Sequence, residues 1–240
     1  MRVIEFTGRN NRIGLLARNA TKGPETDLMK SFRRYVPRCL RWQKGDTAIF
    51  WEPQVETGFP DLVAVQYVPK VFQTWSHARC QLTSLDLKIM HHFFRVGATD
   101  SSSLFKTLGL RATDLLAALE RLLDAQLITR SHRKWMPQPL KKVFGIVSIV
   151  AVEAKIKNWD SAFEQGHINQ WFASESYILS PVEKPRQAVL ERSNRTGVGI
   201  FLLNGTTVRR LRSARKHQIP ASYGSWLFNE WVGRHINHCH

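Results

Sequence analysis

The pattern of apolar and polar positions divides the chain into three segments. Apolar residues at helical spacing predict a helix between Gly23 and Pro37. Residues 47–55 and 61–68 carry β-branched and aromatic side chains on either side of a turn, which favours two strands of a hairpin. The first segment is therefore expected to begin an α/β domain.

Helical spacing returns between Leu82 and Met136. Thr83 followed by Asp86 is typical of a capping box at the start of a first helix. The elements expected after it are, in order, a second helix at 101–108 that stops at Gly109, a third, leucine-rich helix capped by Thr113, and two basic strands at 127–130 and 133–136.

The third segment contains the most apolar run of the chain. Residues 143–155 predict a central strand buried on both faces, and Asn158 and Asp160 could cap a helix at 161–174. Another strand at 177–179 would complete a parallel crossover unit. The Asn204-Gly205 pair predicts a final hairpin. An open, mixed α/β sheet flanked by helices is the expected fold class.

Charge narrows the range of partners. The 240 residues include 35 Lys and Arg against 19 Asp and Glu, which gives a net charge of +16 and favours nucleic acid over a membrane as the partner. The hydrophobic content of 43% indicates a globular core. No apolar run approaches the roughly 20 residues of a membrane helix, so we expect a cytoplasmic, nucleoid-associated protein.

Cysteine and histidine usage favours neither a disulfide framework nor a metal site. Cys39, Cys80 and Cys239 are too few and too scattered for a disulfide framework or a four-cysteine metal site, which favours a reducing compartment. Residues 235–240 contain three histidines that could ligate zinc, but no second cluster matches them. A frayed tail is therefore expected at the C-terminus.

The candidate chemistry lies in two distant sequence pairs. Glu153-Ala154-Lys155 ends the apolar run, and alternation along a strand would direct Glu153 and Lys155 to the same face. Asp61, after Pro60, could supply a second carboxylate for Mg²⁺. Either pair can occur by chance, but a charged pair that closes an apolar strand is costly unless it faces a wet pocket.

Taken together, these features resemble the PD-(D/E)XK, or restriction-endonuclease-like, nucleases. The two motifs are 92 residues apart (153 minus 61), which is more than is usual in that family. Residues 82–136 resemble a winged helix-turn-helix module and explain over half of this distance as an insertion. The resemblance implies a nuclease core at 1–81 and 137–240, with the module inserted at 82–136.

The resemblance also implies roles for individual residues. Asp61, Glu153 and the carbonyl of Ala154 would hold one or two Mg²⁺ ions, for which Mn²⁺ can substitute, and Lys155 would orient or deprotonate the attacking water. Gln165 would point back at the metal site from the crossover helix, where several members also carry Tyr four residues later; this chain has Asn169 there. Glu25, Glu52 or Glu56 could add a further carboxylate.

The function implied is a metal-dependent DNA endonuclease of prokaryotic type, acting in genome defence, repair or mobile-element processing on duplex or branched DNA. Cutting both strands would favour a homodimer or a partner subunit. The alternative is a catalytically inactive, nuclease-fold protein that binds DNA, and RNA as the substrate also stays open. The basic residues expected to contact nucleic acid are Arg33, Arg34, Arg111, Arg130, Arg133, Lys134, Arg209, Arg210 and Arg212.

Overall fold

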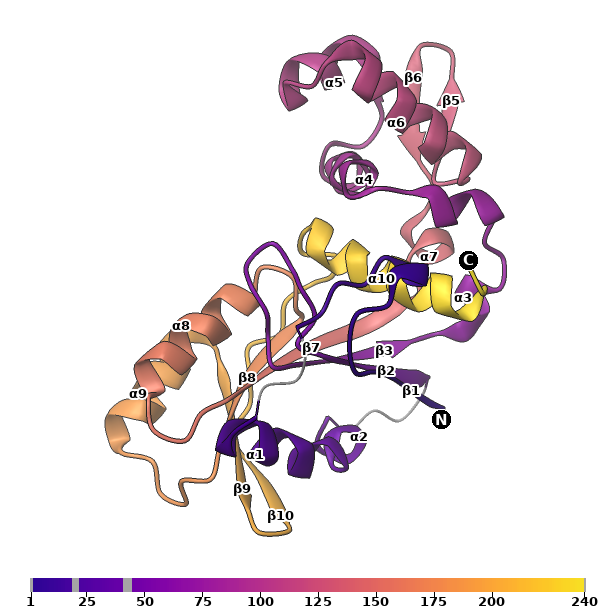
Figure 1. The fold of residues 1–240 in the computed structure, drawn as a ribbon. Coiled ribbons are helices and arrows are strands. Elements are labelled where there is room, and N and C mark those ends of the chain that lie inside the picture. The colour runs from indigo at the N-terminus through magenta and orange to yellow at the C-terminus, as the bar shows by residue number, and fades with distance from the viewer. Residues whose placement is uncertain (1, 19–21, 41–44, 240) are drawn as a thin grey trace. The chain divides into compact units, whose positions relative to one another are not determined.

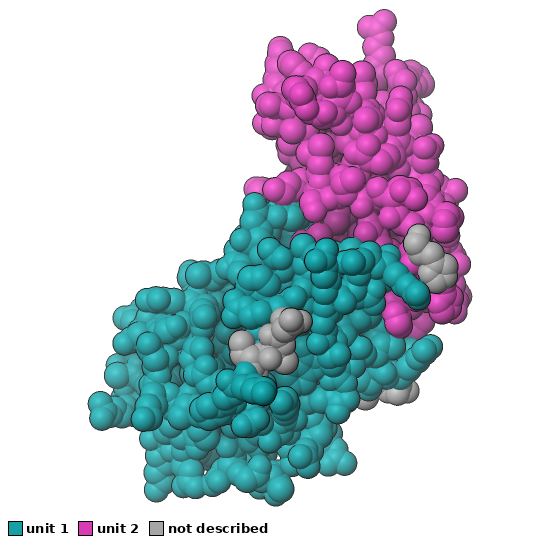
Figure 2. All heavy atoms as spheres, in the orientation of Figure 1, with its two compact units in different colours: residues 1–67, 146–225 teal, residues 68–145, 226–240 magenta. Residues whose placement is uncertain are grey.

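The computed structural model describes residues 2–18, 22–40 and 45–239. It is an α/β protein with a seven-stranded mixed sheet, a three-stranded sheet and helices (Figure 1). The chain divides into two compact units, coloured separately in Figure 2. Unit 1 comprises residues 1–67 and 146–225, and unit 2 comprises residues 68–145 and 226–240.

Unit 1 is built on the seven-stranded sheet, whose order is β1-β2-β3-β7-β8-β9-β10. Its strands are β1 (Val3–Phe6), β2 (Asp46–Trp51), β3 (Leu62–Tyr67), β7 (Ile146–Ala154), β8 (Glu175–Ser180), β9 (Gly199–Asn204) and β10 (Thr207–Arg212). The strand β7 pairs antiparallel with β3 and parallel with β8, so the expected central strand is confirmed. The parallel crossover and the Asn204-Gly205 hairpin are confirmed as well.

Helices cover both faces of this sheet. They are α1 (Pro24–Arg33), α2 (Val36–Cys39), α8 (Trp159–Asn169) and α9 (Gln187–Thr196), with a short 3-10 turn, η1 (Asn11–Ile13), near the N-terminus. Phe32 of α1 belongs to one buried cluster, together with Val152, whereas Phe163 of α8 belongs to a second cluster with Ile200. The sheet is therefore the middle layer between two helical layers, which Figure 1 shows.

Several boundaries in unit 1 differ from the expected ones. The first helix ends at Arg33 rather than at Pro37, because Pro37 needs no backbone donor in the first turn of α2 and sits there instead. The strand expected to run to residue 55 ends at Trp51, because Glu52 adopts a left-handed backbone with φ 42°. Strand β1 and helix α9 were not expected.

Unit 2 contains the three-stranded sheet, ordered β4-β6-β5, and several helices. Its elements are α3 (Pro69–Phe72), the 3-10 turn η2 (His77–Gln81), α4 (Ser84–Val96), β4 (Thr99–Asp100), α5 (Ser101–Leu108), α6 (Ala112–Asp124), β5 (Ile128–Ser131), β6 (Lys134–Pro137), α7 (Leu140–Val143) and most of α10 (Tyr223–Ile236). It is larger than the expected segment 82–136, since it also takes in α3, η2, α7 and the C-terminal helix.

The local signals in unit 2 explain where its helices begin and end. The capping box between Thr83 and Asp86 is confirmed, and so is the stop at Gly109, whose φ of 62° suits glycine. Thr113 does not cap the third helix, because the helix begins at Ala112 and Arg111 occupies the cap position, two residues earlier than expected. Across the described ranges, no helix has the length and apolarity that crossing a bilayer requires.

The C-terminus is anchored, contrary to the expectation of a frayed tail. Cys239 is buried and forms a disulfide with Cys80, 159 residues away, a single cross-link that was not predicted from the sequence. A buried ion pair between Arg79 and Glu230, with a nitrogen–oxygen distance of 2.5 Å, also connects η2 to α10. Packing of α10 against the unit brings these distant groups together.

Candidate metal and phosphodiester site

Strand pairing brings Asp61 next to the Glu153-Ala154 pair. Leu62 of β3 is the register partner of Val152 in β7, so Asp61 stands opposite Glu153 in the antiparallel ladder. The backbone N–H of Ala154 donates a hydrogen bond of 2.8 Å to Oδ2 of Asp61. The two motifs therefore meet although they are 92 positions apart in the sequence.

The side chain of Glu153 is buried and is held by helix α8. Only 2% of this residue is exposed, and the side-chain amide of Asn169 donates a hydrogen bond of 2.6 Å to its Oε1. Burial first, and the nearby Asp61 carboxylate second, raise the pKa of Glu153 to about 8. At neutral pH and without a cation, this carboxyl group holds its proton.

Lys155 lies one residue beyond the end of β7 and is paired with helix α1. Its Nζ lies 3.2 Å from Oε2 of Glu25, and its backbone N–H donates to the carbonyl of Leu179 in β8. The expectation that Glu153 and Lys155 share one face of the sheet is wrong. The strand ends at Ala154, and Glu153 bonds to α8 whereas Lys155 bonds to α1, on the opposite face.

The charges of this cluster nevertheless interact. Burial raises the pKa of Asp61, whereas the Ala154 N–H and the Lys155 ammonium group act to lower it. The same ammonium group also acts to lower the pKa of Glu153. Asp61 therefore interacts electrostatically both with the buried Glu153 and with the Lys155–Glu25 ion pair.

A small acidic cavity adjoins Asp61. It has a volume of about 40 Å³ and is lined by Glu25, Thr26, Met29, Trp51, Glu52 and Asp61. This volume is enough for a water molecule or a small cation. Of the further carboxylates considered, Glu25 and Glu52 lie here, whereas Glu56 accepts a hydrogen bond from the Tyr223 hydroxyl.

The residues around Asp61 fit a hard divalent cation. Mg²⁺ in proteins takes one or two carboxylates and completes its shell with water and substrate oxygens. Asp61, Glu153 and the Ala154 carbonyl supply that kind of donor. Burial raises the pKa of Asp61 and of Glu153, and the Asp61 carboxylate raises that of Glu153 further, so a cation would relieve the cost of ionising both groups. Among the described residues, no group of three or more His, Cys, Asp or Glu is arranged to hold a metal ion.

Gln165 does not join this cluster. It lies on the exposed face of α8, because the buried face of that helix is formed by Ala162, Phe163, Gly166 and Asn169. Asn169, one turn further on, occupies the inward position that the resemblance assigned to Gln165. The helical phase of α8 could have revealed this, since residues 162, 166 and 169 share one side of a helix.

The basic residues expected in unit 1 have different surroundings. Arg33 is bonded to Glu5, so part of its charge is already balanced, whereas Arg34, Arg209 and Arg212 are exposed. Arg210 lies over the ring of Phe201, 5.6 Å from its centroid. A cavity of about 410 Å³ joins α2 to the edge strand β10; its lining residues are Tyr35, Arg38, Phe201, Thr206, Thr207, Val208 and Arg210. Arg38 was not predicted, although it follows the other arginines of the same helical segment.

The basic residues expected in unit 2 lie on α6 and on the β5–β6 hairpin. Arg111 is ion-paired with Asp114 at 2.8 Å, although 84% of its side chain is exposed. Arg130 lies over the ring of Trp135, 5.0 Å from its centroid. Arg133 and Lys134 are exposed at the hairpin. The hairpin thus carries most of the free positive charge expected in this unit.

Comparison of the chain with protein-family models, with curated proteins and with solved structures finds no match. The functional assignment consequently depends on the geometry of Asp61, Glu153 and Lys155 and on the charge of the chain.

Proposed function

We propose that unit 1 is a metal-dependent nuclease of the PD-(D/E)XK type that hydrolyses phosphodiester bonds in DNA. The observation that carries the proposal is the meeting of Asp61 with the Glu153-Ala154-Lys155 segment on neighbouring strands. Chance motifs 92 residues apart have no reason to meet in this way. The net charge of +16 supports a polyanionic substrate.

The arrangement of the sheet supports the same proposal. A mixed sheet with helices on both faces, in which an antiparallel β2–β3–β7 part continues into a parallel β7–β8–β9 part, suits a restriction-endonuclease-like core. In unit 2, the order α4, α5, α6 and the β5–β6 hairpin, with β4 as third strand, suits a winged helix-turn-helix module. Such a module would help position duplex DNA.

Each residue of the site has a definable role in this proposal. A divalent cation at Asp61, Glu153 and the Ala154 carbonyl would supply Lewis-acid polarisation of the phosphate and a bound water of lowered pKa. Lys155 places a positive charge beside the reacting phosphate, and Glu25 fixes the position of that ammonium group. Asn169 fixes the orientation of the Glu153 carboxyl group.

Cleavage assays with supercoiled, linear and branched DNA test the proposal. We expect products with Mg²⁺ or Mn²⁺ and none with a chelator. Asp61→Ala, Glu153→Ala and Lys155→Ala should abolish cleavage while DNA binding persists. Gln165→Ala is the matched control, because this side chain is exposed on the neighbouring helix and should be dispensable. Unaltered cleavage by the three alanine variants would reject the proposal.

A second candidate is a nuclease-like protein that binds DNA without cutting it. The observation that favours it is the burial of Glu153, which does not line the acidic cavity beside Asp61. It predicts a mobility shift with no products under any metal. Genome defence, repair or mobile-element processing would suit the first candidate, and regulation of DNA would suit the second.

A further inference from the structure

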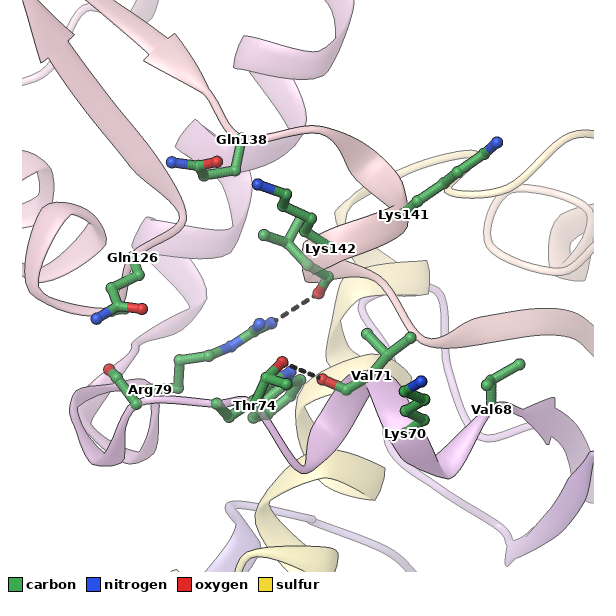
Figure 3. Close-up of a pocket in the computed structure, with 13 residues that line it drawn as sticks. Val68, Lys70, Val71, Thr74, Arg79, Gln126, Gln138, Lys141 and Lys142 are labelled. Atoms are coloured by element: carbon green, nitrogen blue, oxygen red, sulfur yellow. Dashed lines mark hydrogen bonds between the residues drawn. The ribbon is translucent and has the colours of Figure 1, made fainter.

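Unit 2 contains a basic cavity that the proposed nuclease site does not use. Its volume is about 600 Å³, and its walls come from α3, η2, the α6–β5 turn and the segment that leads into α7 (Figure 3). This volume lies within the range of about 300–1,000 Å³ that small-molecule sites occupy. All of its lining residues belong to unit 2.

The charged side chains that line the cavity are all basic. Lys70, Lys141, Lys142 and Arg79 line it, and none of its lining residues is acidic. Arg79 is neutralised by Glu230, so the three lysines provide the net charge. In Figure 3 the side chain of Lys142 extends toward Gln138, whereas that of Lys141 extends away from it. An anionic ligand is therefore expected, with Lys142 as its main contact.

Two side-chain amides add hydrogen-bonding groups to the cavity. Gln126 and Gln138 line the same wall, and neither amide has a hydrogen-bond partner within the part of the chain that the structure describes. An amide offers one acceptor and two donors, which is the pattern that the edge of a nucleobase complements. The apolar wall formed by Val68, Val71 and Val143 could pack against a base or sugar.

The backbone of Gln126 points to a role for its side chain. Its φ is 56°, in the left-handed region, where it ends α6 in a turn that also bonds the Leu127 N–H to the Leu122 carbonyl. Glycine suits this position because it has no Cβ, whereas a glutamine there is strained. A strained glutamine that faces a cavity is the kind of outlier that marks a binding site.

We propose that this cavity binds a nucleoside phosphate, with the phosphate at Lys142 and the adjoining Gln138 and the base at Gln126 and the apolar wall. The ligand is either a free nucleotide or the terminal nucleotide of a DNA strand. Inorganic phosphate alone would leave most of the volume unused, and an acyl chain would leave the lysines unpaired. The proposal goes beyond the proposed nuclease function and does not depend on it.

Calorimetric titration of the full-length protein tests the proposal, with a chelator present so that no cleavage occurs. The probes are adenosine monophosphate, adenosine diphosphate, inorganic phosphate, and one oligonucleotide with either a 5′-phosphate or a 5′-hydroxyl end. We expect saturable nucleotide binding that Lys142→Ala weakens at least tenfold. Lys106→Ala, which removes an exposed lysine from α5 in the same unit, is the control and should leave binding unchanged.

The Gln126→Gly variant separates binding from folding. Relief of the left-handed strain should raise the melting temperature by about 2–4 °C, while nucleotide affinity falls. A more stable protein that binds more weakly cannot be explained by misfolding. If Gln126→Gly leaves nucleotide affinity unchanged, the base-recognition role is wrong.

Competition distinguishes the two sources of the ligand. A 5′-phosphorylated oligonucleotide that displaces the nucleotide better than its 5′-hydroxyl form does identifies a strand end, and no displacement by either form identifies a free nucleotide. Binding should persist in Glu153→Gln, so failure of the nuclease proposal leaves this one intact. Absence of nucleotide binding at millimolar concentration, or equal losses in Lys142→Ala and Lys106→Ala, would overturn it.

Discussion

Asn169 donates its side-chain amide to Glu153 across 2.6 Å, and this bond joins helix α8 to the end of the central strand β7. Both residues are almost fully buried. The bond fixes which carboxyl oxygen of Glu153 remains available to a cation, so Asn169 is a positioning residue in the proposed site.

Removing this donor should shift the pH dependence of cleavage. The Asn169 bond acts to lower the pKa of Glu153, which burial and Asp61 raise to about 8. Asn169→Ala should therefore raise that pKa further and move the acidic limb of the pH–rate profile to higher pH. Stability should also fall, by about 1–3 kcal/mol, because a buried acceptor loses its partner. Rates measured between pH 6 and pH 10 check the shift, and an unmoved profile would show that Asn169 is only structural.

Glu153 should make the metal-free protein less stable as pH rises. Its folded-state pKa of about 8 lies above its ordinary value of 4.5, so the folded state binds a proton that the unfolded state releases between these values. The contribution of Glu153 to stability is greatest below pH 4.5 and is lost as pH rises through the folded-state pKa of about 8. Glu153→Gln should remove this loss and stabilise the protein by about 2–5 kcal/mol at pH 8.5. Urea unfolding at pH 5 and pH 8.5 measures the effect; a variant less stable than wild type at pH 8.5 contradicts it.

Glu25 should affect the cleavage rate because it holds the Lys155 ammonium group in position. Glu25→Gln removes the ion pair at 3.2 Å but keeps the size of the side chain, so the ammonium group loses its fixed position. We expect kcat to fall about 10-fold or more while DNA affinity changes little, since a misplaced proton-transfer or charge-stabilising group costs rate rather than binding. Single-turnover cleavage and a binding assay on the same variant separate the two quantities. A loss of affinity without a loss of rate would assign Glu25 to substrate binding instead.

The exposed arginines of β10 should contact phosphates without reading sequence. Arg209→Ala and Arg212→Ala should each weaken DNA binding equally for different sequences and reduce the slope of log K against log salt by about 1. Arg33→Ala is the comparison, because Arg33 is already paired with Glu5 and should change the slope less. Equal slopes for all of these variants would place the DNA elsewhere.

Some of this structure could be predicted from the sequence, because local rules determine it. Residues 146–154 form the central strand because a nearly continuous apolar run must be buried on both faces, and Gly109 ends its helix because glycine tolerates a left-handed backbone. The meeting of Asp61 with Glu153 needed more than local rules, and the resemblance of the motifs supplied it.

Other features depend on long-range packing, which the spacing of apolar residues along the sequence does not predict. The partners of Lys155 and Glu153 lie on opposite helical layers because the strand ends at Ala154, which no spacing rule specifies. The Cys80–Cys239 disulfide forms because α10 returns to η2, and nothing in the sequence marks that return. The basic cavity is similarly assembled from four separate segments.

In the proposed nuclease, Asp61 is a ligand of the cation that drives phosphodiester hydrolysis. The most direct measurement is the rate at which wild-type protein and Asp61→Asn nick supercoiled plasmid in Mg²⁺, with DNA binding measured in parallel. We expect nicking by the wild type that a chelator stops, and at least a 100-fold lower rate for Asp61→Asn with unchanged DNA affinity. Equal nicking rates for the two proteins, or no nicking by the wild type with any divalent cation, would contradict this role of Asp61.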